Sequence, residues 1–139
     1  MNPLKHAQGL STTVARVILG IIFLAHGCQK FFVNGMDATA SGFDAMGAPL
    51  PTLSAWVAAI LEFGGGILLI VGIAVPLVSL LLILDMIGAI FITHIDNGFW
   101  SSDGGYELPL ALIAGLIAVA IADQGLASVD SHVLKRLKK

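Results

Sequence analysis

Ile60-Leu61-Glu62-Phe63-Gly64-Gly65-Gly66 lies near the centre of a long apolar run and places one carboxylate directly before three consecutive glycines. A charged side chain at the centre of a bilayer costs about 2.5–3.5 kcal/mol even on membrane-insertion scales, which give the lowest values for this cost. Glu62 therefore needs a basic partner, a bound proton or a water-filled cavity. The glycines allow another helix backbone to come close.

Apolar runs of membrane-spanning length lie on both sides of this stretch. Of the 139 residues, 57% are hydrophobic and 12% are charged, whereas roughly a quarter of the residues of a soluble domain are charged. A helix needs about 20 residues to cross the hydrocarbon core. The sequence predicts an all-α fold, an integral membrane antiparallel four-helix bundle. It forms a single domain over residues 1–139, with helices at roughly 14–33, 53–75, 77–95 and 106–123.

Basic residues gather near the two ends of the chain. The tail Lys135-Arg136-Leu137-Lys138-Lys139 holds four of the seven Lys and Arg residues, and Lys5 and Arg16 lie near the other terminus. By the positive-inside rule, both termini are predicted to be cytoplasmic, which agrees with an even number of spans. Lys30 is an exception at the outer end of the first helix. The net charge of −2 offers no basic footprint for nucleic acid.

The segments on either side of the first span are predicted to differ in structure. Residues 1–11 are polar and predict a loosely ordered lead-in, with Ser11-Thr12-Thr13 as helix N-caps. Beyond the span, Phe43, Met46 and Leu50 recur at spacings of three and four. This spacing predicts a short amphipathic helix on the membrane surface or across the end of the bundle.

Ionisable residues of the predicted helices fall at three depths. Arg16 and Asp123 share the cytoplasmic layer, where we expect a structural ion pair. Glu62 and Asp85 lie near the midplane on adjacent antiparallel helices, where two acids cannot both be ionised cheaply. Either one is protonated and donates a hydrogen bond, or Arg16 or Lys30 reaches inward to neutralise one. A structural role in fixing helix register, a proton relay and a site for a polar headgroup all stay open.

The outer layer holds the candidate binding residues. His26 and Lys30 align at positions i and i+4, on a face directed toward the other helices. The sequence predicts a pocket for a planar carbonyl compound such as a quinone. Glu62 and Asp85 are the candidate catalytic, proton-carrying residues. The candidate cofactor-binding residues are His26, Lys30, His94, Trp100, Tyr106 and Glu107.

Metal and disulfide chemistry have little support in the sequence. No short ligand motif joins His26 and His94 in a metal or haem site, so no metal is expected. Cys28 is the only cysteine, which excludes an internal disulfide and a four-cysteine metal site.

Several short segments of the sequence together match the pattern of a known protein family. They are Arg16-Val-Ile-Leu-Gly20-Ile-Ile-Phe23, His26-Gly27, Gln29-Lys30-Phe31, Leu61-Glu62-Phe63-Gly64-Gly65-Gly66 and Gly105-Tyr106-Glu107-Leu108-Pro109-Leu110. These segments resemble the DoxX family of small four-helix bacterial membrane proteins, and the resemblance covers nearly the whole chain.

The resemblance implies a bacterial cytoplasmic (inner) membrane protein. Relatives in this family include the small membrane subunit type of a thiosulfate:quinone oxidoreductase. A mycobacterial member is a membrane partner for a superoxide dismutase and a thiosulfate sulfurtransferase. The resemblance marks Arg16, Gly27, Lys30, Glu62 and Glu107 as positions of interest and assigns no catalytic role to any of them.

The sequence leaves three functional hypotheses. The first is the membrane subunit of a redox system that binds a quinone. Whether this subunit has enzyme activity by itself stays open. The alternative is a non-catalytic scaffold that anchors soluble redox or oxidative-stress enzymes, with the basic tail as docking segment. The third is a small-molecule or proton-coupled transporter, which would need a homo-oligomer because four helices are few.

Overall fold

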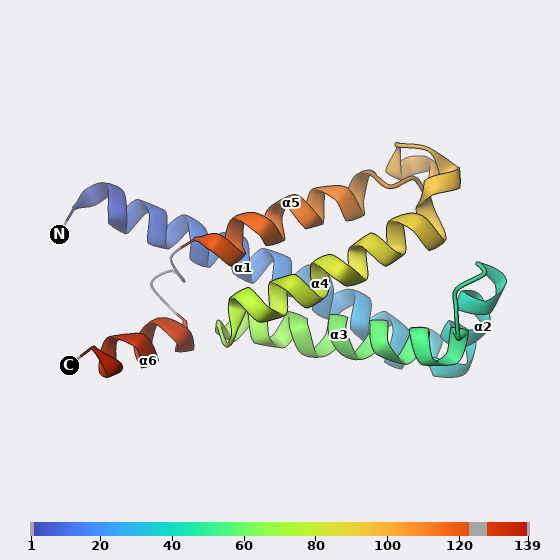
Figure 1. The fold of residues 1–139 in the computed structure, drawn as a ribbon, viewed down its shortest axis with the longest axis horizontal. Helices are drawn as coiled ribbons and strands as arrows, with labels where there is room; N and C mark the ends of the chain where they lie inside the picture. Colours follow the sequence, from blue (N-terminus) through green and yellow to red (C-terminus); the bar gives the residue numbers. More distant parts are fainter. Residues whose placement is uncertain (1, 123–127, 139) are drawn as a thin grey trace.

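The computed structural model describes residues 2–122 and 128–138, and this part of the chain is entirely helical or irregular. The principal helices are α1 (Pro3–Cys28), α3 (Pro51–Val71), α4 (Val75–Ala89) and α5 (Glu107–Ile121). They run back and forth along the long axis of the molecule, with both chain termini at one end and α2 (Met36–Ala45) at the other (Figure 1). We call these the terminal end and the α2 end. The predicted all-α membrane bundle is confirmed.

Within the described residues, three helical segments are long and apolar enough to cross a membrane: Pro3–Asn34, Pro51–Val71 and Val75–Asn97. The first includes the π-helical turn η1 (Gln29–Asn34), and the third includes the π-helical turn η2 (Ile90–His94) and the 3₁₀ turn η3 (Ile95–Asn97). α5 has 15 residues. It is therefore about 22 Å long, shorter than the hydrocarbon core of about 30 Å.

The first helix begins earlier than the sequence predicts. α1 starts at Pro3 rather than near residue 14, because the Asn2 side chain accepts a hydrogen bond from the Leu4 N–H and proline suits the first helical turn. The predicted N-caps at residues 11–13 are wrong. Their hydroxyls donate to carbonyls in the preceding turn, as in Thr12 to Gln8 at 2.9 Å, so they lie inside the helix.

The predicted amphipathic helix around residues 43–50 is displaced in the structure. α2 ends at Ala45, and the chain then takes left-handed conformations at Gly47 (φ +76°) and Leu50 (φ +46°), which a helix cannot contain. α2 packs against α3 and stands at the end of the bundle where α3 begins (Figure 1). Phe43 and Met46 therefore belong to the end of α2 and the turn after it.

Glycines bring α1 and α3 into backbone contact. A Cβ on Gly27 would lie less than 3.0 Å from the backbone of Phe63, and one on Gly66 would meet the backbone of Leu24 equally closely. Close approach through small residues is the usual means of helix association in membranes. The core between the helices is apolar and includes Phe23, Leu69, Leu82, Leu116 and Val119.

The remaining elements are short. α3 and α4 are joined by a tight turn with left-handed residues at Gly72 (φ +74°) and Ala74 (φ +49°), so they form an antiparallel hairpin. The 3₁₀ turn η4 (Ser101–Asp103) lies in the connection to α5, and α6 (Val129–Leu137) stands at the terminal end.

Candidate functional site

A cavity of about 760 Å³ lies between α3 and α4 in the half of the bundle nearer to α2. Its volume is within the range of about 300–1,000 Å³ that is usual for ligand pockets. The walls are largely apolar, with side chains from α1, α2, α3, α4 and α5. The ionisable residues that line it are His26, Lys30, Glu62, Asp85 and His94.

Glu62 is paired with Lys30. The Lys30 Nζ lies 2.5 Å from the Glu62 Oε2, and the side chains are only 17% and 7% exposed. The structure thus selects Lys30, rather than Arg16, as the basic partner of the midplane acid. A charge-assisted bond of this length between two largely buried groups is among the strong hydrogen bonds in proteins.

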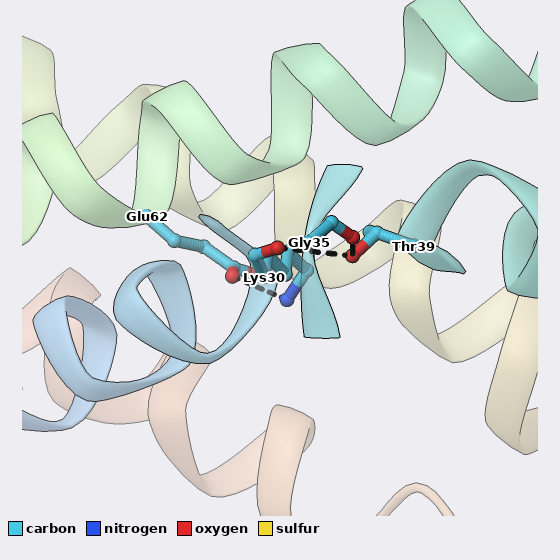
Figure 2. A network of polar contacts seen from close by, with 4 residues as sticks. All are labelled: Lys30, Gly35, Thr39 and Glu62. Atoms are coloured by element: carbon cyan, nitrogen blue, oxygen red, sulfur yellow. Dashed lines mark hydrogen bonds and ion pairs between the residues drawn. The ribbon is translucent and has the colours of Figure 1, made fainter. Parts of the chain in front are cut away.

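Local backbone structure holds Lys30 in position. Lys30 lies in the π-helical turn η1, where the wider i→i+5 bonding alters the register of side chains at the end of α1. The Thr39 hydroxyl lies 3.2 Å from the Lys30 carbonyl oxygen and 2.9 Å from the Gly35 carbonyl oxygen. Figure 2 shows this link, which connects the start of α2 to the ion pair.

Asp85 extends the pair to a cluster of three ionisable groups. Its carboxyl interacts electrostatically with the Glu62 carboxyl and with Lys30. Two neighbouring buried carboxyls cannot both be ionised cheaply, so one of them favours the protonated form. The buried Asp85 Oδ2 accepts no hydrogen bond from a donor in the described residues. Two acids and one base on the wall of an apolar cavity can therefore bind a polar group and hold a transferable proton.

His94 is fixed at the edge of the same cavity. Its Nδ1 lies 2.7 Å from the Gly104 carbonyl oxygen. A carbonyl only accepts, so Nδ1 carries the hydrogen, and in the neutral ring Nε2 is left as an acceptor. Like Lys30, His94 lies in a π-helical turn, η2. Such turns are frequent at functional sites.

The other predicted binding residues divide into two groups. His26 lines the cavity from α1 although it is exposed. Trp100, Tyr106 and Glu107 are not among the residues that line it. The Glu107 Oε2 instead accepts hydrogen bonds from the Ser101 N–H at 3.0 Å and the Ser101 hydroxyl at 3.1 Å.

The two aromatic residues form a separate cluster. The rings of Trp100 and Tyr106 pack edge-on against Phe99, with centroids at 5.1 and 5.7 Å. Their predicted place around a ligand ring is therefore not where the structure puts them. Sequence reasoning also missed Ser54 and Thr93, which add hydroxyl groups to the cavity wall. No spacing signal in the sequence distinguishes these two from other helix hydroxyls.

At the terminal end, Arg16 and Asp130 secure the ends of α3 and α4. The Arg16 guanidinium is fully buried and donates to the Leu69 carbonyl at 2.5 Å and the Ile70 carbonyl at 2.9 Å. The Asp130 carboxylate accepts from the first N–H groups of α4, at 2.9 and 3.0 Å. Asp123, the predicted partner of Arg16, lies outside the described residues. The role of Asp130 was missed because it depends on the return of α6 to the α3–α4 turn.

Metal ligands do not cluster in the described part of the chain. Within residues 2–122 and 128–138, no group of three or more His, Cys, Asp or Glu side chains is arranged to hold a metal ion. The ionisable residues of the cavity are arranged instead as an ion pair with an additional acid.

Comparison with known proteins places these features in a family context. A family model described as DoxX matches residues 11–95. The chain is 35% identical over 129 residues to “Putative oxidoreductase CatD” of Bacillus subtilis (strain 168), which covers 93% of this chain and 91% of that protein. It is 26% identical to inner membrane protein YphA of Escherichia coli (strain K12), over 94% of this chain and 99% of that protein. Inner membrane protein YqjF of the same organism is 25% identical, over 96% and 99% of the two chains. No solved structure matches the chain.

Proposed function

Because the chain belongs to the DoxX family and is similar to bacterial inner membrane proteins, we propose that it is the membrane subunit of a redox system and binds a quinone. The quinone head would occupy the cavity between α3 and α4. The name of the Bacillus subtilis relative, which contains the word oxidoreductase, agrees with this class of function. Electrons would come from a soluble partner enzyme, since none of the motifs in the sequence holds a redox cofactor.

The observation that carries the proposal is the polar cluster in an otherwise apolar cavity. Lys30 offers N–H donors to a ring carbonyl, and Glu62 with Asp85 can hold a proton beside it. Reduction of a quinone to a quinol takes two electrons and two protons, so a carrier site needs an acid within reach of the ring oxygen. Apolar walls with a few convergent polar groups are typical of small-molecule sites.

Direct binding of a quinone to the purified protein in nanodiscs tests the proposal. We expect the variants Lys30→Met and Glu62→Gln to weaken binding by about 10- to 100-fold, the loss typical of a charged hydrogen bond. Ser79→Ala is the matched control, because Ser79 is a buried polar residue of α4 that does not line the cavity. Unchanged affinity in both cavity variants, or no binding to the wild-type protein, would refute the assignment.

The scaffold hypothesis has one structural observation in its favour. α6 stands outside the spanning helices and ends in exposed Lys135 and Arg136, a surface suited to an acidic partner. If both termini are cytoplasmic, as the basic residues predict, this surface faces soluble enzymes. Deletion of residues 133–139 would leave the Asp130 cap and the Ser128–Ser131 hydrogen bond intact. Loss of co-purifying redox enzymes from this deletion, with quinone binding preserved, would support a scaffold role.

A further inference from the structure

Several side chains line the cavity and are also exposed on the outside of the bundle. On α3 these are Leu53, 59% exposed, and Val57, 47% exposed. On α4 they are Leu81, 38% exposed, and Leu84, 57% exposed. A side chain that belongs to both surfaces stands at an opening, so the cavity opens outward between α3 and α4.

The opening lies at the depth of the hydrocarbon core. α3 and α4 meet at the turn of Gly72 and Ala74 and separate toward the α2 end (Figure 1). Leu84 is ten residues beyond Ala74, which places it about 15 Å along α4, near the middle of a span of about 30 Å. An opening at this depth faces lipid chains rather than water.

The rim and the interior of the cavity differ in polarity. The α3 and α4 side chains at this opening are aliphatic, whereas the ion pair of Lys30 and Glu62 is largely buried, with its base supplied by the π-helical turn that follows α1. A molecule arriving from the bilayer would therefore meet apolar groups first and polar groups last. This order suits an amphiphile that enters head first.

We propose that the gap between Val57 and Leu84 is a lateral portal from the bilayer, and that the ligand carries a long apolar chain that stays between α3 and α4. The assignment of a ligand with a long apolar tail rests on the proposed quinone function. The portal itself rests only on the cavity and its exposed rim. A second copy of this chain seated on the gap would instead close it.

Modification by a membrane-soluble carbodiimide tests the portal without any quinone. Dicyclohexylcarbodiimide partitions into lipid and reacts with protonated carboxyls, and mass spectrometry detects its adduct on Glu62 or Asp85. We expect Leu84→Trp and Val57→Trp to slow this modification at least several-fold by filling the gap. The matched controls are Leu80→Trp and Ile60→Trp, at 52% and 57% exposed positions on the same helices that do not line the cavity.

Paired ligands test the apolar chain. A benzoquinone with a chain of several isoprene units and the same ring without a chain are titrated against each variant. We expect Leu84→Trp to weaken the tailed compound by about tenfold more than the bare ring, because the chain loses its apolar contacts. Leu80→Trp should leave both affinities as in the wild type.

The outcomes separate the portal from the quinone. Carbodiimide modification that is slower in the portal variants and unchanged in the control variants supports the portal. If neither quinone binds in the same experiments, the proposed function fails and the portal stands. Equal modification in portal and control variants, or no modification of the wild-type carboxyls, overturns the portal. Equal loss of the tailed compound and the bare ring overturns the chain assignment while leaving quinone binding in place.

Discussion

Replacement of Lys30 by Met should destabilise the protein more than replacement of Glu62 by Gln. Lys30→Met leaves Glu62 and Asp85 side by side after their bonded base is removed. Breaking a buried ion pair in this way costs about 3–5 kcal/mol. Glu62→Gln leaves Lys30 within electrostatic reach of Asp85, so we expect a smaller loss of about 1–2 kcal/mol.

The double variant Lys30→Met/Glu62→Gln should recover most of the loss. It removes both charges of the pair, and replacement of a whole buried pair by neutral groups is often neutral or stabilising. Asp85 can then stay neutral and bond to the amide introduced at position 62. We expect the double variant to lie within about 1 kcal/mol of the wild type. The sum of the single losses should then exceed the loss of the double variant by more than about 2 kcal/mol.

Equilibrium unfolding in mixed micelles, followed by circular dichroism, measures these free energies. Lys135→Met on exposed α6 is the control for loss of a lysine charge as such, and it should change stability by less than about 0.5 kcal/mol. Additive single losses would show that Lys30 and Glu62 are not energetically coupled. A larger loss for Glu62→Gln than for Lys30→Met would contradict the place given to Asp85.

Three further changes test the packing, the helix cap and the histidine. Gly27→Ala should cost about 1–3 kcal/mol in unfolding free energy, because its Cβ would press on the Phe63 backbone, whereas Gly64→Ala has open space and should cost far less. Asp130→Ala should lower stability by about 1–2 kcal/mol through loss of the α4 cap, measurable in the same unfolding assay. His94→Phe should weaken binding of a quinol, which donates to Nε2, by about tenfold in a titration, and an unchanged affinity would remove His94 from the site.

The spanning helices were predictable because their signal is local. Long apolar runs and the cost of unpaired backbone groups in lipid leave helices as the only solution for this composition. The helix ends were less predictable. The start of α1 depends on one side-chain bond from Asn2, and no apolar periodicity marks it. The left-handed residues Leu50 and Ala74 are not glycines, so turn chemistry gave no signal there either.

The sequence predicted that Glu62 needs a basic partner but did not predict which basic residue it is. The depth of Glu62 required a base, and both Arg16 and Lys30 lay on the first helix at suitable spacing. The choice of Lys30 depends on how α1 packs against α3. Gly27 lies against Phe63, next to Glu62, whereas Arg16 bonds to the Leu69 and Ile70 carbonyls, about two turns farther along α3. Helical periodicity gives the face of each residue and not the relative height of two packed helices. Glu107 was assigned to the pocket for a similar reason, since its bond to Ser101 depends on the fold of the loop before α5.

The three consecutive glycines acquire distinct surroundings once the helices are packed. Gly66 faces the backbone of α1, Gly65 faces Leu82 of α4, and Gly64 has open space around its Cα. The closest approach of α1 and α3 therefore includes Gly27 against Phe63. Phe63 directly follows Glu62, and Gly27 lies three residues before Lys30. A bond of 2.5 Å between two side chains on different helices needs such an approach, because a wider spacing would separate the charges in an apolar setting. The helix contact and the ion pair thus depend on each other. Gly27→Ala should consequently lower the energetic coupling between Lys30 and Glu62 as well as the stability.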